Sequence, residues 1–384
     1  MTAANFSSRM IYVDNAATTR PDDEALTLMS ELQRKFFANP SSAYKLARPL
    51  KKILRESREK IAACINAAPE EIIFTSGGTE SDNQAIKAVV LEHLGKHPHI
   101  ITSAVEHKAV LNSCGAMKNC GGTLTILPVD GTGAVDPDEL RKKILPQTKI
   151  ISVMTANNEV GTIQPIKALV AIAHAAGKIF HTDAVQAVGH IPIDVKDSGA
   201  DMLSASEHKF NGPKGVGFLY IRGGLKPAPY LDGGGQEFSR RAGTENVAAI
   251  AAMALALEKN CRDIKKNAEY LSTLEKILLD RLNTDGADFI LNGGDNRLPG
   301  HLSLSFRNCD GEALMHRLDL KNICVSTGSA CNARQTEISH VLRALNVDEN
   351  YIRGTIRITF GKDNSVEDAN TLGECLTAII RRSD

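Results

Sequence analysis

Apolar and polar positions follow a regular order along the first 220 residues. Short, continuous apolar runs rich in β-branched residues are typical of strands buried in a parallel sheet. Stretches with helical spacing separate them, such as the run that carries Ile53, Leu54, Ile61 and Ile65. Strands are expected at 71–75, 99–103, 124–129, 149–154, 178–183 and 216–221. This alternation predicts an α/β fold with a mainly parallel, doubly wound sheet.

The pattern changes after residue 222. A Gly- and Pro-rich stretch over 223–235 precedes a long, Ala-rich helical run that ends near residue 282, with breaks expected near Asn260 and Cys261. Strand patterns at 301–306 and 355–360 then mix with helical patterns at 311–318 and 365–380. This mixture predicts a second, smaller α+β domain, with the long helix as the bridge to it.

Composition excludes few functions. Apolar residues make up 42% of the chain and charged residues 23%, as in ordinary globular proteins, and the formal net charge is zero. Bulk charge therefore favours neither nucleic acid nor an anionic membrane as a partner. The first nine residues are polar, and no apolar run approaches the roughly 20 residues of a membrane span. We expect a cytoplasmic protein.

Eight cysteines are scattered along the chain without a CxxC pair, which argues against a structural zinc site and favours reduced thiols. His93, His97 and His99 cluster near the end of a predicted helix. A metal site is one interpretation, but no further ligand has suitable spacing, and the helix dipole favours histidines there. We expect no metal.

Polar residues gather where predicted strands end. In parallel sheets, ligands bind beyond the carboxyl ends of the strands. The residues that fall at this edge are Gly78, Thr79, His107, Asn158, Asp183 and Gln186. Gly78 and Thr79 follow a strand and open a helix, so they are typical of a phosphate cradle, and equally of an ordinary strand-to-helix turn.

Lys209 lies on a Gly- and Pro-punctuated loop between two apolar segments. A single lysine is most often a solvated surface amine, but Ser206 and His208 lie beside this one and Asp183 precedes it. A lysine that binds pyridoxal phosphate covalently needs a phosphate anchor and a carboxylate for the pyridine nitrogen, and the chain offers candidates for both. Cys331, among small residues on a polar loop, is either an incidental thiol or a nucleophile.

Motifs in a fixed order extend over almost the whole chain. They are Tyr12 to Thr19, Ser76 to Asn83, Glu106 to Lys108, Asn157 to Gly161, Asp183 to Gln186, His208-Lys209 with Gly212 to Gly215, Arg241 to Thr244, Gly328 to Cys331, and Arg357. Together they closely resemble the pyridoxal-phosphate-dependent cysteine desulfurases of the NifS/IscS type, in the class V aminotransferase family. The resemblance implies a fold-type I, aspartate-aminotransferase-like homodimer with a seven-stranded type of sheet. Its large domain would be 18–260, and 1–17 with 261–384 would form the small domain that carries the Cys331 loop.

The resemblance also implies roles for single residues. Lys209 would bind the cofactor covalently and move the proton at Cα, Asp183 would pair with the pyridinium nitrogen, and His107 would stack on the ring. Gln186 and Asn158 would bond the phenolic oxygen side, although Asn158 would alternatively face the substrate carboxylate. The expected phosphate ligands are Gly78, Thr79, Ser206 and His208, with Thr244 reaching the phosphate of the neighbouring subunit.

For the substrate, L-cysteine, the resemblance implies that Arg357 and Asn15 or Ala16 receive the carboxylate. Cys331 would attack the substrate sulfur, leaving a persulfide and L-alanine. The sulfur would pass to an acceptor protein for iron–sulfur cluster assembly or for tRNA or cofactor thiolation. The sequence identifies neither the acceptor nor any activator.

Two positions depart from the family pattern. Glu207 replaces a small residue before His208-Lys209, which would add negative charge near the phosphate, and Tyr44 replaces a usual histidine. Two other functions remain open. One is a different fold-type I lyase or transaminase, such as a selenocysteine lyase, that does not use Cys331, and the other is a cofactor-free interaction protein.

Overall fold

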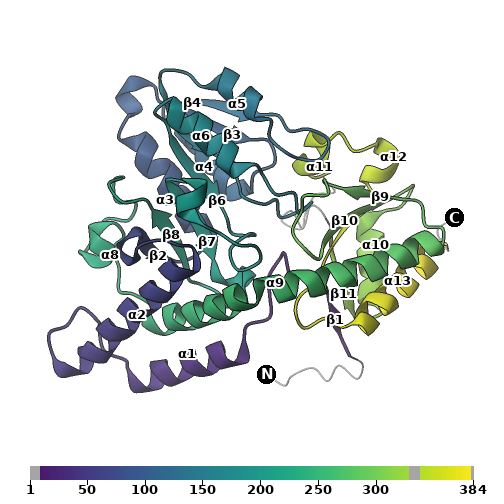
Figure 1. Cartoon of the computed structure of the whole chain (residues 1–384), viewed down its shortest axis with the longest axis horizontal. Helices are drawn as coiled ribbons and strands as arrows, with labels where there is room; N and C mark the ends of the chain where they lie inside the picture. The colour runs from purple at the N-terminus through teal and green to yellow at the C-terminus, as the bar shows by residue number, and fades with distance from the viewer. Residues whose placement is uncertain (1–8, 328–337, 382–384) are drawn as a thin grey trace.

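A seven-stranded sheet forms the centre of the larger part of the molecule (Figure 1). The structure is a computed structural model and describes residues 9–327 and 338–381. In spatial order the strands are β2 (Ile72–Thr75), β8 (Gly217–Ile221), β7 (Met202–Ser206), β6 (Ile179–Asp183), β5 (Thr148–Ser152), β3 (His99–Ser103) and β4 (Thr123–Leu127). β8 is antiparallel to both of its neighbours, and the other pairs are parallel. The predicted α/β class and the mainly parallel sheet are confirmed.

Both faces of the sheet are buried except at its edge strand β4, where Thr123 and Ile126 are exposed. Ile100 and Ile150 pack into the apolar core beneath α3 (Gly78–Leu91) and α4 (Lys108–Asn119), whereas their neighbours Ile101 and Ile151 pack into the core on the opposite side. Successive side chains of a strand point to opposite faces, so a sheet covered on both sides needs continuous apolar strands. The remaining helices of this part are α1 (Asp23–Lys35), α2 (Arg48–Cys64), α5 (Pro137–Lys143), α6 (Ile166–Ala175), α7 (Val195–Ser198) and α8 (Gln236–Ser239).

A 38-residue helix, α9 (Val247–Thr284), joins the two parts of the molecule. Its first half packs against α1 and α2, and its second half against α13 (Val366–Ile380). The break expected near Asn260 is wrong, because the helix continues through this residue. The Asn260 amide donates to the carbonyl of Ala256, one turn earlier, and to the carbonyl of Phe210. Asn260 therefore fastens α9 to the loop that follows Lys209.

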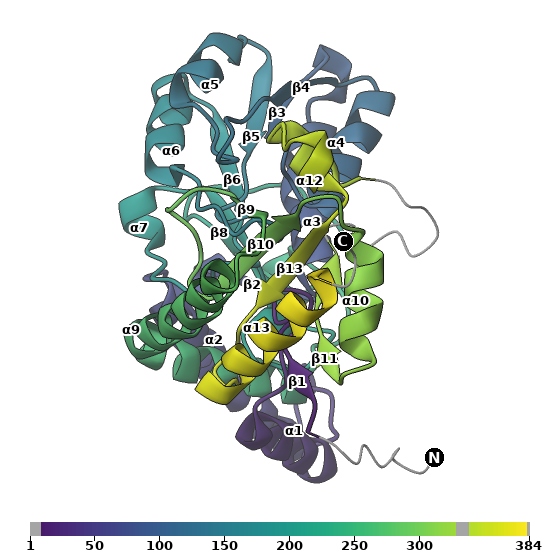
Figure 2. The same cartoon turned by 90° about the vertical axis from the view of Figure 1, so that its right-hand side faces the viewer.

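The smaller part contains an antiparallel sheet and a strand pair (Figure 2). The sheet has the order β12 (Ser326–Thr327), β13 (Thr355–Thr359), β10 (His301–Phe306) and β9 (Phe289–Asn292), and β1 (Ile11–Tyr12) pairs in parallel with β11 (Ile323–Cys324). The other elements of this part are α10 (Gly311–Asp319), α11 (His340–Ala344) and α12 (Glu349–Ile352). Short 3₁₀ turns lie in the larger part, at η1 (Lys45–Ala47), η2 (Pro69–Glu71), η3 (Leu94–Lys96) and η4 (Glu207–Lys209). Ile11 and Val13 share an apolar core with the C-terminal helix, so both ends of the chain build this part.

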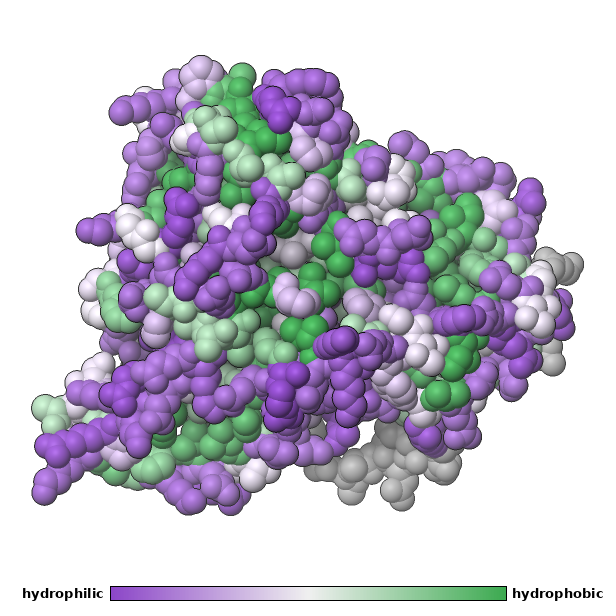
Figure 3. Space-filling view, in the orientation of Figure 1, coloured by the Kyte–Doolittle hydropathy of each residue, from purple (hydrophilic) through white to green (hydrophobic). Residues whose placement is uncertain are grey.

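Among the described residues, no helix is long and apolar enough to cross a membrane. In the view of Figure 3, hydrophilic side chains predominate and hydrophobic ones are interspersed among them.

Candidate active site

A cavity of about 1090 Å³ lies at the carboxyl ends of the sheet strands. Residues of the smaller part of the molecule, among them Arg357 of β13 and His340 of α11, also line it. Eleven of the predicted site residues line this cavity: Ala16, Gly78, Thr79, His107, Asn158, Asp183, Gln186, Ser206, His208, Lys209 and Arg357. The structure therefore brings together, from segments far apart in the sequence, the groups that the sheet-edge argument placed near one another.

Three predicted residues are not part of this lining. The Asn15 side chain donates to the carbonyl of Thr359 at 2.9 Å and faces a separate, small cavity. Thr244 is exposed on the segment before α9. Cys331 lies outside the described residues.

Lys209 ends the short turn η4, directly after β7, and its side chain enters the cavity. The ammonium group donates to the carbonyl of Ala16 at 2.6 Å and to that of Ala17 at 2.8 Å. The imidazole of His190 donates to the Lys209 main-chain carbonyl at 2.7 Å, which fixes the backbone from the other side. The amine is thus held inside the molecule, unlike the solvated surface lysine that was the alternative.

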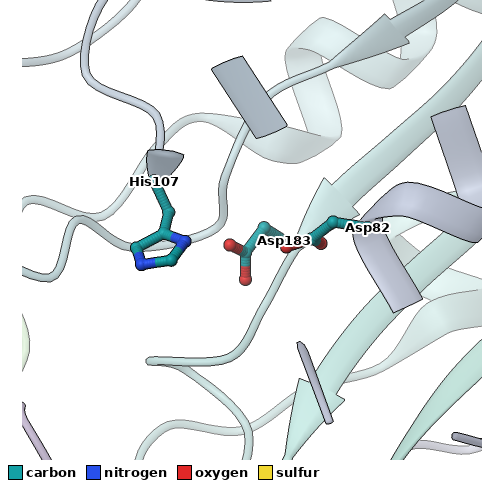
Figure 4. A group of neighbouring side chains, drawn as sticks. All are labelled: Asp82, His107 and Asp183. Carbon is teal, nitrogen blue, oxygen red and sulfur yellow. The ribbon is translucent and has the colours of Figure 1, made fainter. Parts of the chain in front are cut away.

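Asp183 is the last residue of β6 and is 4% exposed. One carboxylate oxygen accepts the N–H of Val185 at 2.9 Å. Burial raises the pKa of Asp183, while His107 and Lys209 nearby favour its ionised form and oppose this shift. Figure 4 shows Asp183 between the imidazole of His107 and the carboxyl group of Asp82, and ligand atoms of these three residues lie within 4.8 Å of one another.

His107 caps the N-terminus of α4. Its Nδ1 accepts the N–H of Ala109 at 3.1 Å, so in the neutral ring the proton is on Nε2. Burial lowers the pKa of His107, and the positive charge of Lys209 acts in the same direction. A neutral, planar imidazole in this position suits stacking on an aromatic ring.

At the N-terminus of α3 the main chain packs closely against its neighbours. A Cβ atom on Gly78 would lie 2.6 Å from Cγ2 of Val185, so this position requires glycine. The first N–H groups of a helix have no intrahelical acceptor and favour an anion. Ser206 and His208 line the same end of the cavity, and burial lowers the pKa of His208 to about 4. The arrangement can hold a phosphate through neutral hydrogen-bond donors.

Arg357 offers a cation for a substrate carboxylate. Its guanidinium bonds the Asp14 carboxylate at 2.7 Å and the main-chain carbonyl of Asn158 at 2.9 Å. Nε is buried and has no hydrogen-bond partner among the described residues. Gln186 donates to the carbonyl of Ala16 at 3.0 Å, and so fixes the same turn that Lys209 contacts.

Sequence reasoning assigned no role to several acidic residues here. Glu106 is fully buried, accepts hydrogen bonds from Ser103 and from the N–H of Met154, and has a pKa raised by burial to about 8. The buried Glu159 accepts from the Ser339 hydroxyl, and burial raises its pKa to about 7. Both residues lie in motifs that are visible in the sequence. Their burial depends on packing in the folded protein, which the sequence alone does not reveal.

The two departures from the family pattern lie outside the cavity lining. The carboxyl group of Glu207 is buried and accepts the N–H of Val216 at 2.7 Å. Burial raises the pKa of Glu207 to about 7, which opposes the negative charge that the sequence suggested at this position. Tyr44 is 55% exposed and precedes η1.

The cavity fits the expected cofactor. It presents an amine in Lys209, a buried carboxylate in Asp183 for a ring nitrogen, and an imidazole in His107 for stacking. The glycine-dependent helix N-terminus at Gly78 supplies the anion site. Each group lines one cavity, as binding of a single pyridoxal phosphate requires.

Comparison with known proteins also indicates a pyridoxal-phosphate enzyme, and the similarity extends over nearly the whole chain. The family model "Aminotransferase class-V" matches residues 11–372. The chain is 47% identical to cysteine desulfurase IscS of Dictyoglomus turgidum over 375 residues, which cover 97% of this chain and 95% of that one. It is 44% identical to cysteine desulfurase IscS of Methanosarcina thermophila, over 98% of this chain and 93% of that protein.

Solved structures of similar fold point to the same family. A "NifS-like protein" superposes with a TM-score of 0.92 at 37% identity and covers 97% of this chain and 100% of its own. The structure described as "SspA in complex with cysteine" has a TM-score of 0.83 at 35% identity, over 91% of this chain and 98% of that one. Proteins of this kind depend on pyridoxal phosphate and have fold type I. The chain therefore belongs to the class V aminotransferase family, among its cysteine desulfurases of the NifS/IscS type.

Proposed function

We propose that this protein converts L-cysteine to L-alanine and captures the sulfur as a persulfide on Cys331. The observation that carries the proposal is the convergence of Lys209, Asp183 and His107 in one cavity. The similarity to proteins named cysteine desulfurase supports the reaction, and the related protein SspA was solved with cysteine.

Pyridoxal phosphate, when bound, supplies an electron sink that stabilises negative charge at the substrate Cα. Lys209 would hold it covalently, Asp183 would bond the ring nitrogen, and His107 would lie against the ring. Gln186 and Asn158 would bond the phenolic oxygen side. The phosphate would bind to Gly78, Thr79, Ser206 and His208.

The polypeptide orients the substrate and moves its protons. Arg357 binds the substrate carboxylate through a guanidinium that Asp14 holds in place, and Asn15 or Ala16 would add a second contact. The Lys209 amine lies in the same cavity, so it can accept the proton from Cα and return it. In the structure, the amine donates hydrogen bonds to the carbonyls of Ala16 and Ala17.

Cys331 completes the reaction. Its thiolate attacks the substrate sulfur, an S–S bond forms as the Cβ–S bond breaks, and the electron pair of that bond stays with the carbon fragment, which takes up a proton to give alanine. Cys331 is outside the described residues, and Ile338 and Ser339, the first described residues after it in the sequence, line the cavity. The Ser339 hydroxyl donates to the buried Glu159 carboxylate, which holds Ser339 at the cavity.

The persulfide sulfur would then pass to an acceptor protein, in iron–sulfur cluster assembly or in tRNA or cofactor thiolation, in the cytoplasm. We further propose a homodimer in which Thr244 contacts the phosphate bound by the neighbouring subunit. Its exposure, outside the cavity of its own chain, supports this assignment.

Mass spectrometry after reaction with L-cysteine tests the role of Cys331. We expect a mass increase of one sulfur on the peptide that contains Cys331, and loss of both this species and alanine formation in Cys331→Ser. Cys324→Ser, on the partly buried strand β11, is the control and should keep both. Full alanine formation by Cys331→Ser would refute the proposal and favour a lyase or transaminase that does not use this thiol.

A further inference from the structure

Asp82, in the first turns of α3, is a buried carboxyl group to which the reaction above assigns no role. It is 1% exposed and contributes to the cavity lining. Figure 4 shows it on the side of Asp183 opposite His107, with its carboxyl group directed toward Asp183. It is therefore placed behind the carboxylate that is expected to bond the ring nitrogen of the cofactor.

Among the described residues, no lysine or arginine forms an ion pair with Asp82. The imidazole of His181 lies 3.7 Å from Oδ1, but burial lowers the pKa of His181 to about 3, so this ring is neutral. Both of its nitrogens are also engaged, with Ser152 at 2.8 Å and Ser204 at 2.9 Å. Oδ1 of Asp82 has no hydrogen-bond partner among the described residues.

The other titratable neighbours of Asp82 make ionisation still less favourable. Asp183 of β6 and Glu106, after β3, are acids, and each raises the pKa of Asp82 in addition to the larger effect of burial. The Ser204 hydroxyl opposes the shift to a smaller extent. Cys114 of α4 is neutral, because burial raises its pKa to about 12.

Two carboxyl groups that share a buried site do not both ionise readily, and the proton stays on the one with less compensation. Asp183 has the compensation. It accepts the N–H of Val185, and His107 and Lys209 stabilise its negative charge. Among the described residues, only the Ser204 hydroxyl favours the ionised form of Asp82, so the proton belongs on Asp82.

We propose that Asp82 is a positioning residue that stays a neutral carboxylic acid behind Asp183. The pair then carries one negative charge, located on Asp183. The Asp82 carboxyl group, with an oxygen within 4.8 Å of one of Asp183, packs behind Asp183 and keeps it oriented toward the ring nitrogen. The role in orienting Asp183 toward the ring rests on the proposed function, whereas the protonation of Asp82 does not.

Two substitutions separate charge from hydrogen bonding. Asp82→Asn replaces a neutral acid by a neutral amide of the same shape, so we expect an unchanged pH midpoint for the visible absorption of bound pyridoxal phosphate. Asp82→Leu replaces the polar group beside Asp183 with an apolar one, so we expect the Kd for pyridoxal phosphate to rise roughly tenfold, because the buried charge of Asp183 loses a polar neighbour. A shift of the midpoint by one pH unit or more in Asp82→Asn, or wild-type affinity in Asp82→Leu, would overturn the proposal.

Infrared difference spectroscopy tests the protonation state of Asp82 directly, in the presence and absence of pyridoxal phosphate. At pH 7 the spectrum of wild type minus Asp82→Asn should contain the carbonyl stretch of a protonated carboxylic acid. A carboxylate band in its place would contradict the proposal. If the wild type bound no pyridoxal phosphate, the proposed function would fail, but the infrared measurement on the protein alone would still decide whether Asp82 is protonated.

Discussion

Glu207 allows a quantitative test of the burial that the structure assigns to it. The substitution Glu207→Gln keeps an oxygen that can accept the N–H of Val216, but it removes the ionisable group. Gly212 packs against the side chain, with a hypothetical Cβ only 2.7 Å from Cβ of Glu207, so an isosteric replacement is needed. Only the titration of the residue changes.

The magnitude follows from the pKa of Glu207, which burial raises from 4.5 to about 7. Between these two values the folded protein keeps a proton that the unfolded chain has lost. The stability contributed by neutral Glu207 is therefore complete below about pH 4.5 and is lost as the pH rises to 7. The difference of about 2.5 pH units corresponds to about 3 kcal/mol at 1.36 kcal/mol per unit.

Urea unfolding followed by circular dichroism measures this effect. We expect Glu207→Gln to exceed the wild type in free energy of unfolding by about 1 kcal/mol or less at pH 5, and by about 3 kcal/mol at pH 8. Glu269→Gln, at an exposed position of α9, removes the same charge and is the control. An advantage of Glu207→Gln that is equal at the two pH values, or a less stable variant at pH 8, would refute the reasoning.

Three further substitutions test the site. Lys209→Ala should lose the visible absorption of covalently bound cofactor and lower alanine formation by roughly 10² to 10⁴ with an unchanged circular dichroism spectrum; undiminished alanine release would disprove the assignment of the lysine. Arg357→Lys should raise the KM for L-cysteine about tenfold with little change in kcat, since it replaces the bidentate guanidinium that Asp14 holds. Arg307→Lys, at an exposed ion pair, is the control and should change neither value. An unchanged KM in Arg357→Lys would exclude Arg357 as the carboxylate site. Gly78→Ala should weaken pyridoxal phosphate binding about tenfold in a fluorescence titration, because the overpacking costs roughly 1–3 kcal/mol. Gly115→Ala, whose new Cβ would meet no atom within 4 Å beyond its own stretch of helix, should bind normally, and equal affinities of the two variants would show that α3 tolerates a side chain at position 78.

The sequence was sufficient to predict the arrangement of the sheet edge. Strand ends of a parallel sheet lie together, so Asp183 after one strand and His107 after another were expected to be neighbours, and both line the cavity. The long helix was also predicted, but its break was not found, since Asn260 makes its second hydrogen bond to Phe210, which is 50 positions away. Helical pattern alone does not contain such a contact.

The chemistry of the buried acids was not predictable from sequence. Asp82 follows a helical pattern like any polar residue near a helix start, and only the packing of α3 against the sheet and α4 removes it from water. The same is true of Glu207, which the sequence presented as an added charge and the structure buries against Val216. A pKa depends on neighbours in space, so these residues became informative only with the fold.

Product analysis is the most direct test of the central claim. The purified protein would be supplied with L-cysteine, pyridoxal phosphate and a thiol reductant, and alanine, sulfide, pyruvate and ammonia would be quantified. The proposed function predicts alanine and sulfide in equal amounts, with both lowered by roughly 10² to 10⁴ in Lys209→Ala. Pyruvate with ammonia would instead mean β-elimination and would contradict the attack of Cys331 on the substrate sulfur.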